Sequence, residues 1–508
     1  MPDQAGIPGQ HGGSPWRRCR CHRLFSLRVA LLTRRGLLPL LPLLVMLATA
    51  CVAARGPNVG PAVALPSRGL SVANGPALRW MLHLAEDLHL HQRVCREDGI
   101  GVTEVDRVGP VDARASRFAT PLLVVDGCFD NDIDLAGAAL ALDARSAAAR
   151  VGDDIVMASP DVWLWTTAGL RAGTLTVTTA PGLRFVSPFP MEADGSFSVD
   201  PSTWRYLSCA MFGRLDVHSV LVADVSLEVV VLPGERLMVG ADVDRWLGAA
   251  VTAVSLGAGR GHRFPFERTQ IIVEPVGGDG VPFGMISRGG GPQAHLLLGQ
   301  QARIDDVIGS WVAVHELSHL LHPLLDLTDA WFGEGFASYQ QNILRARAGL
   351  MTEDECWAAL ADGLRRGADA SLRGPRTRSL QDASSAMRTE GTYLQVYWGG
   401  AAVVLWLDMA LRQCADRSID DVVATFRAEQ PRVDARRVPA REIVERAAAS
   451  ATECAYITEA VDGLLREPFP RGGMALLREM GVYEAGLSST APLARLRQAI
   501  TRPMLVRR

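Results

Sequence analysis

Residues 311–323 of the chain are Trp-Val-Ala-Val-His-Glu-Leu-Ser-His-Leu-Leu-His-Pro. The apolar residues of this stretch recur with helical spacing, which predicts a helix over residues 305–322 that ends before Pro323. His315 and His319 are four residues apart, so they project from one face of that helix, one turn from each other. Two imidazoles placed in this way can bind one Zn²⁺ ion, and Glu316 beside them can take a proton from a bound water molecule.

The following helical stretch supplies a third group that could bind the same ion. Residues 329–339 are Asp-Ala-Trp-Phe-Gly-Glu-Gly-Phe-Ala-Ser-Tyr, which places Glu334 fifteen residues after His319. A zinc ion that activates water has three protein ligands and one open position. A carboxylate on the next helix is a natural third ligand, so His315, His319 and Glu334 are the candidate metal ligands.

These two motifs resemble the gluzincin metallopeptidases, in particular the zinc aminopeptidases that are similar to leukotriene A4 hydrolase. The resemblance rests on His315-Glu316-x-x-His319 and on Trp-Phe-Gly-Glu334-Gly-Phe-Ala-Ser-Tyr. It implies a single zinc ion held by His315, His319 and Glu334 in a thermolysin-like α/β domain, with Glu316 as the general base. Fourteen residues separate His319 from Glu334, whereas about eighteen are usual in that family, a difference of roughly one helical turn.

A tyrosine further along the chain is a candidate oxyanion donor. Residues 392–408 resemble the Tyr-x-Lys-Gly-Ala helix start of the same enzymes, and more closely that of the glycyl aminopeptidase family. The resemblance implies that the Tyr397 hydroxyl donates to the oxyanion of the tetrahedral intermediate, and Gly399 stands where the family has lysine. Two alternatives remain open: Tyr397 is a core residue, or Tyr393, one turn earlier, is the donor.

A strand upstream of the histidine motif is the candidate substrate-binding edge. Gly284, Met285 and Ile286 lie where these enzymes have a Gly-Ala-Met-Glu-Asn strand, to which the substrate backbone adds by β-augmentation. The family glutamate that holds the free amine of the substrate would fall at Ile286, which cannot bind an amine. Aminopeptidase specificity therefore does not follow from the resemblance. The alternative is that residues 283–291 form a glycine-rich loop without a ligand.

His322 is not expected to bind the metal. It lies on roughly the same helix face as His315, but two turns, about 10 Å, beyond it, which is too far for one tetrahedral site. We predict a helix-end histidine that is favoured by the helix dipole. Leu325 stands where a metzincin would have its third histidine, so that class of peptidase is excluded.

The amino-terminal part of the chain resembles an export signal. Arg34 and Arg35 precede an uncharged run over residues 36–50, and Cys51 follows small residues as in the lipobox of bacterial lipoproteins. We expect a lipoprotein anchored to the membrane through Cys51; a simple cleaved signal and an uncleaved single-span anchor are the alternatives. Each of the three places the body of the protein outside the cytoplasm, at the bacterial cell envelope, facing the periplasm or the cell surface.

The cysteines allow disulfides in such a compartment. The chain has nine cysteines, and six of them follow Cys51, an even number that permits disulfide pairing. Cys414 and Cys454, both in the helical carboxy-terminal part, are the first predicted pair. Buried free thiols are the alternative.

Patterning along the chain predicts a multidomain α+β protein. The segments are a signal (1–50), a tether and amino-terminal segment (51–119), an antiparallel β-sandwich (120–240), the catalytic domain (241–412) and a helical domain (413–508). A hydrophobic content of 48% and a charged content of 21% are those of a globular protein. The net charge of −3 leaves no basic field, so a nucleic acid partner is not expected.

The leading hypothesis from the sequence is a zinc-dependent, aminopeptidase-like metallopeptidase that acts on peptides or proteins at the bacterial cell envelope. A different class of protein is also compatible with the residues: a non-catalytic, zinc-containing lipoprotein that binds peptides or partners on the same fold. The absence of lysine at Gly399 and of glutamate at Ile286 motivates this second hypothesis.

Overall fold

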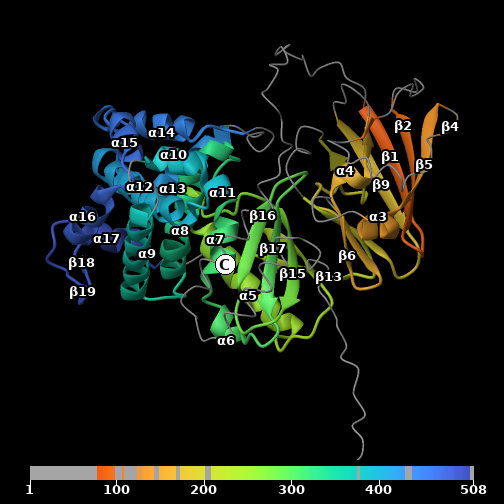
Figure 1. Cartoon of the computed structure of the whole chain (residues 1–508), viewed down its shortest axis with the longest axis horizontal. Coiled ribbons are helices and arrows are strands. Elements are labelled where there is room, and N and C mark those ends of the chain that lie inside the picture. The colour runs from red at the N-terminus through yellow and green to blue at the C-terminus, as the bar shows by residue number, and fades with distance from the viewer. Residues whose placement is uncertain are drawn as a thin grey trace, which may run out of the picture.

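The computed structural model describes residues 77–97, 106–107, 123–125, 127–141, 148–166, 172–200, 208–373, 378–429 and 437–503. The predicted export signal, Cys51 and the tether that follows it lie outside these residues. Two β-sheets form one end of the molecule, a third sheet lies in the middle, and helices form the other end (Figure 1). The architecture is multidomain α+β, as predicted at that level of detail, and the largest sheets contain both parallel and antiparallel pairs.

Two sheets pack face to face in the amino-terminal part. The first has six strands in the order β11-β9-β1-β2-β5-β4, and the second has four in the order β10-β12-β7-β6. Their bounds are β1 (Ala77–Leu84), β2 (His89–Arg96), β4 (Leu123–Val125), β5 (Cys128–Asp134), β6 (Ala148–Val151), β7 (Ile155–Ala158), β9 (Ala172–Thr179), β10 (Arg184–Val186), β11 (Phe197–Val199) and β12 (Ala210–Gly213). One hydrophobic core lies between them, with Trp80, Trp163 and Phe212 fully buried.

This β region differs from the predicted antiparallel sandwich in its start and its pairing. β1 and β2 precede residue 120, where the sandwich was predicted to begin, and β1 runs parallel to β9. In β1 the inward residues, such as Leu78 and Trp80, alternate with outward ones. Because apolar Met81 occupies one outward position, the period of two is hard to recognise in the sequence.

A five-stranded mixed sheet lies in the centre, in the order β13-β14-β15-β17-β16. Its strands are β13 (Asp216–Val222), β14 (Val225–Val231), β15 (Arg268–Val276), β16 (Phe283–Ser287) and β17 (Gln293–Gly299). β13 and β14 lie in the segment that was predicted to be part of the sandwich, but β14 pairs in parallel with β15. Helix α5 (Gly240–Ser255) makes the crossover that the parallel pair β14 and β15 requires. The prediction differed because the sequence of the hairpin β13–β14 does not reveal which sheet it joins.

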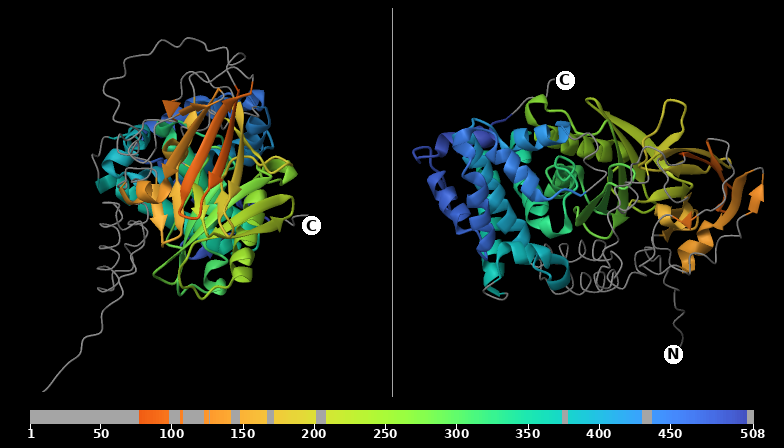
Figure 2. Two further views of the ribbon diagram at one scale, coloured as in Figure 1. Left: turned by 90° about the vertical axis from the view of Figure 1, so that its right-hand side faces the viewer. Right: turned by 90° about the horizontal axis from the view of Figure 1, so that it is seen from above.

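The central sheet also contacts the four-stranded sheet. Val230 and Ile272 of the central sheet share a small hydrophobic core with Met157 and Met211 of the four-stranded sheet. Figure 2 shows the amino-terminal strands and the central sheet next to each other from two further directions. The two β regions are therefore joined by packed side chains as well as by the chain itself.

Helices cover the central sheet and continue to the carboxyl end. They are α6 (Ile304–Val307), α7 (Trp311–Ser318), α8 (Ala330–Arg347), α9 (Glu353–Arg373), α10 (Leu380–Ser385), α11 (Met387–Glu390), α12 (Tyr393–Cys414), α13 (Ile419–Glu429), α14 (Ala440–Ala448), α15 (Ile457–Arg466), α16 (Arg471–Glu479) and α17 (Ala494–Thr501). One continuous hydrophobic core extends from the central sheet through these helices to Ile500. The helices after residue 413 therefore share their core with the central part.

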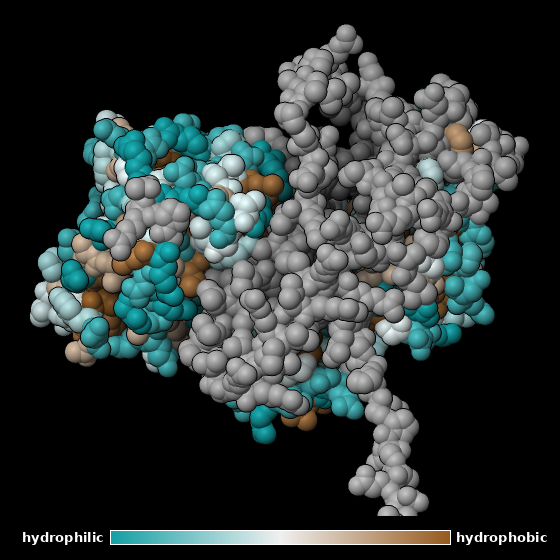
Figure 3. Space-filling view, in the orientation of Figure 1, coloured by the Kyte–Doolittle hydropathy of each residue, from teal (hydrophilic) through white to brown (hydrophobic). Residues whose placement is uncertain are grey.

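Helix α12 is the one described helix that is long and apolar enough to cross a membrane. It is 89% buried over its most apolar window, as expected for the central helix of a packed core. The outer surface of the helical part is mainly hydrophilic, with separate hydrophobic patches (Figure 3).

Helices α8 and α12 cross at two glycines. A Cβ atom on Gly335 would lie 2.3 Å from the carbonyl carbon of Gly400, and one on Gly400 would lie 1.9 Å from the carbonyl oxygen of Trp331. Only residues without a side chain allow backbones to approach this closely. The crossing therefore brings Glu334, next to Gly335, against the first turns of α12.

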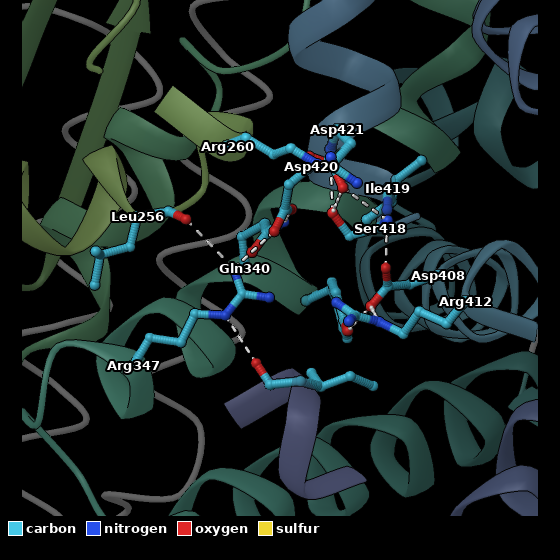
Figure 4. Close-up of polar contacts among 12 residues, drawn as sticks. Leu256, Arg260, Gln340, Arg347, Asp408, Arg412, Ser418, Ile419, Asp420 and Asp421 are labelled. Atoms are coloured by element: carbon cyan, nitrogen blue, oxygen red, sulfur yellow. Dashed lines mark hydrogen bonds and ion pairs between the residues drawn. The ribbon is translucent and has the colours of Figure 1, made fainter. Parts of the chain in front are cut away.

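A buried polar network holds the last turn of α8 (Figure 4). Arg347 donates from Nη1 to Asp420 Oδ2 at 2.7 Å, and from Nε to the carbonyl oxygen of Ile500 at 2.8 Å. Gln340 of α8 donates to the other oxygen of Asp420. Arg347 and Asp420 are both almost fully buried. The network therefore links α8 to α13 and to α17.

Two disulfides are present among the described residues. Cys414 and Cys454 are bonded, which confirms the predicted pair. Cys95 and Cys128 join β2 to β5, a pair that was not predicted. The remaining two described cysteines are not disulfide-bonded, and one of them, Cys356, is fully buried.

Candidate active site

Helix α7 positions the two histidines of the motif. The predicted helix over residues 305–322 is interrupted, because α6 ends before Ser310 and α7 begins after it. Ser310 is the N-cap of α7, and its hydroxyl accepts from the backbone N–H of Val312. Helix α7 ends before His319, whose backbone is nevertheless right-handed helical, so its side chain still follows His315 on the same face.

His315, His319 and Glu334 converge on one point. Nε2 of His315 and Nε2 of His319 each lie 3.5 Å from Oε2 of Glu334, and the three ligand atoms lie within 4.8 Å of one another. Zinc–ligand bonds of about 2.0–2.1 Å in a tetrahedron place ligand atoms about 3.3–3.4 Å apart. The arrangement therefore fits a zinc ion, because Glu334 reaches the two histidines despite the short connection from His319.

The imidazoles hold Glu334 in its charged form. Burial alone would raise the pKa of this carboxyl group, but His319 and His315 outweigh burial and hold the pKa of Glu334 well below its usual range. An ionised carboxylate is the form that binds a metal ion.

A hydrogen bond orients His315 for metal binding. Its Nδ1 lies 2.8 Å from Oε1 of Gln341, which can only accept, so Nδ1 carries the proton and Nε2 keeps its lone pair. Gln341 is on α8, seven residues and two turns after Glu334. Gln341 was not predicted from the sequence, although a polar residue two helical turns after Glu334 is a signal that could have identified it.

His322 orients His319 in the same way. Nδ1 of His322 donates to the carbonyl oxygen of Pro323 at 2.7 Å, so its Nε2 accepts from Nδ1 of His319 at 3.2 Å. Nε2 of His319 is then free to face Glu334. Burial, together with the charge of Arg288, holds the pKa of His322 well below its usual value, so the ring is neutral.

The helix-end role predicted for His322 was wrong. His322 is not one of the three ligand candidates. Helix α7 ends before it, and its pKa is lowered, whereas a helix dipole acting on an end residue would raise it. Its contact is with the metal-facing histidine instead.

Arg288 closes the carboxyl end of α7. Its guanidinium donates to the carbonyl oxygen of His322 at 2.8 Å and to that of His319. Arg288 is 6% exposed, and it follows β16, so it ties the strand predicted to bind substrate to the end of α7. In the sequence Arg288 precedes a run of glycines, and nothing there signals this contact.

Glu316 is buried beside the three ligand candidates, without being one of them. Burial raises the pKa of Glu316 above its usual value. Gly284 of β16 packs against Glu316: a Cβ atom at Gly284 would lie 2.5 Å from Cγ of Glu316. Gly284 is thus a glycine because the general-base candidate packs against it.

The other two residues of the predicted substrate edge occupy different positions. Met285 is in register with His295 of β17 and alternates to the sheet face away from Gly284. Ile286 is on the same face as Gly284 and packs against the large core. β16 is the edge strand of the central sheet, which is where an added strand can pair.

Two tyrosines of α12 lie near the convergence point. The Tyr397 ring stacks on the His315 ring, with centroids 5.8 Å apart and planes 6° apart. Burial raises the pKa of Tyr393, and the charge of Glu334 adds to the shift. The Tyr393 hydroxyl is buried and has no hydrogen-bond partner among the described residues. Gly399, two residues after Tyr397, lies against Leu380: a Cβ atom on Gly399 would be 2.9 Å from a Leu380 methyl group.

Comparisons with known proteins agree with the motifs. The sequence profile of the M61 glycyl aminopeptidase family matches residues 324–405, which include Glu334 and Tyr397. An aminopeptidase N family protein from Idiomarina loihiensis is similar with a TM-score of 0.54 and 14% identity, over 80% of this chain and 78% of that one.

Two further solved structures were matched less closely. An M1 zinc metallopeptidase from Deinococcus radiodurans gives a TM-score of 0.45 and 15% identity, over 78% of this chain and 96% of that one. Yeast LTA4 hydrolase in complex with bestatin gives a TM-score of 0.45 and 11% identity, over 78% and 68%. No curated protein matches the chain.

The family profile and the fold together support a metallopeptidase. The profile begins after the histidine motif, so the motif and the profile are separate observations on adjoining segments. The chain is similar to the M61 glycyl aminopeptidases over residues 324–405 and has a fold similar to that of an aminopeptidase N family protein, which confirms the resemblance first drawn from its motifs.

Proposed function

We propose that this chain is a zinc-dependent, aminopeptidase-like metallopeptidase of the gluzincin kind that hydrolyses peptide bonds at the bacterial cell envelope. The observation that supports it most is the convergence of His315, His319 and Glu334 beside a buried glutamate, Glu316. The location is supported by the sequence alone, namely by the run over residues 36–50 and by Cys51 as the lipid-bearing residue.

The candidate site residues have different roles in the proposed hydrolysis. Zinc held by His315, His319 and Glu334 would supply a Lewis acid and lower the pKa of a coordinated water molecule toward about 7. Glu316 takes a proton from the attacking water and passes it to the leaving amine. Its raised pKa suits both steps, because a carboxyl group nearer neutrality accepts and returns a proton more readily.

Two further elements would bind the substrate. Tyr397, stacked on His315, donates its hydroxyl to the oxyanion of the tetrahedral intermediate, with Tyr393 as the second candidate for that role. The free edge of β16 receives the substrate backbone as an added strand. Ile286 offers no carboxylate for a substrate amine, so we assign peptide-bond hydrolysis without requiring a free amino terminus.

The test is the substitution Glu316→Gln in the purified protein. We expect peptide hydrolysis on a peptide library to fall by about 10²–10⁴-fold, while zinc content stays at about one ion per chain, because Glu316 is not among the ligands. Glu274→Gln is a matched control: Glu274 is also buried, but it pairs with His295. It should keep wild-type hydrolysis. Unchanged hydrolysis in Glu316→Gln would falsify the proposed mechanism.

A zinc-containing binding protein is the second candidate function. Two positions favour it. Gly399, where related enzymes have lysine, lies against Leu380, and Ile286, where they have glutamate, packs against the large core. Zinc and peptide affinity without turnover on the same library would select this function over hydrolysis.

A further inference from the structure

A ladder of cross-strand pairs lies on the outward face of the six-stranded sheet, remote in sequence from the peptidase site. Along β2 and β5 the successive pairs are the disulfide Cys95–Cys128, the ion pair Arg93–Asp130 (2.8 Å), His91 opposite Asp132, and His89 opposite Asp134. Side chains at alternate positions of a strand share one face, so both histidines and both aspartates project outward together.

One aspartate oxygen is shared by the two histidines. Nδ1 of His89 lies 3.4 Å, and Nδ1 of His91 lies 3.3 Å, from Oδ1 of Asp132. This oxygen is buried and has no hydrogen-bond partner among the described residues, since neither imidazole approaches it with hydrogen-bond geometry. A buried carboxylate oxygen without a donor is costly unless a cation or another donor satisfies it.

The two nitrogen–oxygen separations are those expected around a metal ion. Zinc–ligand bonds of about 2.0–2.1 Å in a tetrahedron give ligand separations of about 3.3–3.4 Å. At the peptidase site the corresponding separations, from His315 and His319 to Glu334, are both 3.5 Å. The sheet face therefore matches the helix site in its two nitrogen–oxygen separations, whereas its two imidazole nitrogens lie farther from each other.

A third imidazole stands beside this group. His83 of β1 is in register with His91, and their rings lie parallel with centroids 6.2 Å apart. Nδ1 of His83 lies 2.9 Å from the hydroxyl of Thr178, which leaves Nε2 on the opposite side of the ring. His83, His91 and Asp132 also line a shallow cavity of about 510 Å³, so there is room for an ion with its waters.

We propose that this face is a second transition-metal site, the sheet-face site, in which His89, His91 and Asp132 bind a divalent ion such as Zn²⁺ and His83 is available as a fourth ligand. Imidazole and carboxylate ligands suit zinc, and the Arg93 charge is already neutralised by Asp130. The bound ion would join β2 to β5 on the same face as the Cys95–Cys128 disulfide.

Binding requires one ring to turn. Among the described residues, only His315, His319 and Glu334 have all their ligand atoms within 4.8 Å of one another. The side chains of His89 and His91 are 38% and 53% exposed, so rotation about their side-chain bonds meets little packing resistance. Nδ1 of each ring is already within 3.4 Å of Asp132 Oδ1, so the movement needed is one that brings the two nitrogens closer to each other.

The test counts zinc ions in the purified, metal-stripped full chain after equilibrium dialysis against buffered micromolar zinc. We expect two ions per wild-type chain, one in His91→Ala and one in His319→Ala, because each variant removes one site. His218→Ala is the matched control: His218 pairs with Asp244 at 2.7 Å, has no second imidazole, and should keep two ions.

The outcomes separate this site from the proposed peptidase. A zinc count that His91→Ala retains in full, with wild-type circular dichroism, overturns the sheet-face site. A zinc count that His319→Ala retains in full contradicts the helix site instead. Asp132→Asn is a second variant of nearly unchanged size, which should also lose one ion if the carboxylate is a ligand.

Discussion

Replacing Gly284 by alanine tests how closely β16 positions the general-base candidate. Gly284 has ordinary backbone dihedral angles, so alanine introduces no backbone strain there. The new methyl group would lie 2.5 Å from Cγ of Glu316, 2.9 Å from a Leu296 methyl and 3.1 Å from a Val312 methyl. The substitution therefore acts on the site through packing, without touching any of the three metal-ligand candidates.

The magnitude follows from these distances. Ordinary carbon–carbon contact is about 3.5–4.0 Å, so Glu316 must retreat by about 1 Å. A misplacement of about 1 Å in a catalytic group costs about 10²-fold in rate, which is about 2.7 kcal/mol of transition-state stabilisation. Overpacking against Leu296 and Val312 should also lower the free energy of unfolding by about 1–3 kcal/mol.

The assay is kcat/KM on the best library peptide, with zinc content and thermal unfolding measured on the same sample. Gly280→Ala is the control, because a Cβ atom at that position meets nothing within 4 Å. We expect Gly284→Ala to lose about 10²-fold in kcat/KM while it retains zinc, and Gly280→Ala to match the wild type. Full activity in Gly284→Ala would refute the claim that Glu316 is held by this contact.

Three other substitutions test separate features. Glu334→Ala should reduce zinc at the helix site from about one ion per chain to nearly none. Metal analysis measures this in a His91→Ala background, which lacks the sheet-face site, and retained zinc would contradict the three-ligand site. His322→Ala should weaken zinc binding there by about 10–100-fold in chelator competition, and unchanged affinity would show that it does not orient His319. Arg347→Met should lower the free energy of unfolding, measured in urea, by about 3–5 kcal/mol, because it leaves the buried carboxylate of Asp420 without its ion-pair partner. Arg365→Met, which removes an exposed ion pair, should lower it by about 0–1 kcal/mol, and similar losses in the two variants would contradict this reasoning.

The sequence predicted those parts of the site that follow from local geometry. His315, Glu316 and His319 are close because four residues make about one helical turn, whatever the rest of the fold does. Glu334 required the resemblance as well, since its distance from His319 depends on a connection that is shorter than usual. The disulfide Cys414–Cys454 was predicted because both cysteines lie in the helical carboxy-terminal part of the chain.

The residues that the sequence did not reveal act across long separations. Arg288 contacts the end of α7 from the position after β16, 31 residues before His319, and the glycines that follow it carry no recognisable signal. His322 was given the wrong role because the break at Ser310 and the early end of α7 change what a helix-end residue can contact. The strands β1 and β2 were missed because apolar Met81 faces outward in β1 and polar Gln92 faces inward in β2, and both conceal the alternation.

The buried link between Arg347 and Ile500 affects the order in which the fold can be completed. Glu334 and Arg347 are thirteen residues apart on α8, so about 20 Å of helix separates the metal-ligand candidate from the anchor. The partner of that anchor, the carbonyl of Ile500, comes 153 residues later in the chain. During synthesis, this hydrogen bond can form only after nearly the whole polypeptide has been made. The helix that carries Glu334 therefore gains its full set of buried contacts only when the chain is almost complete.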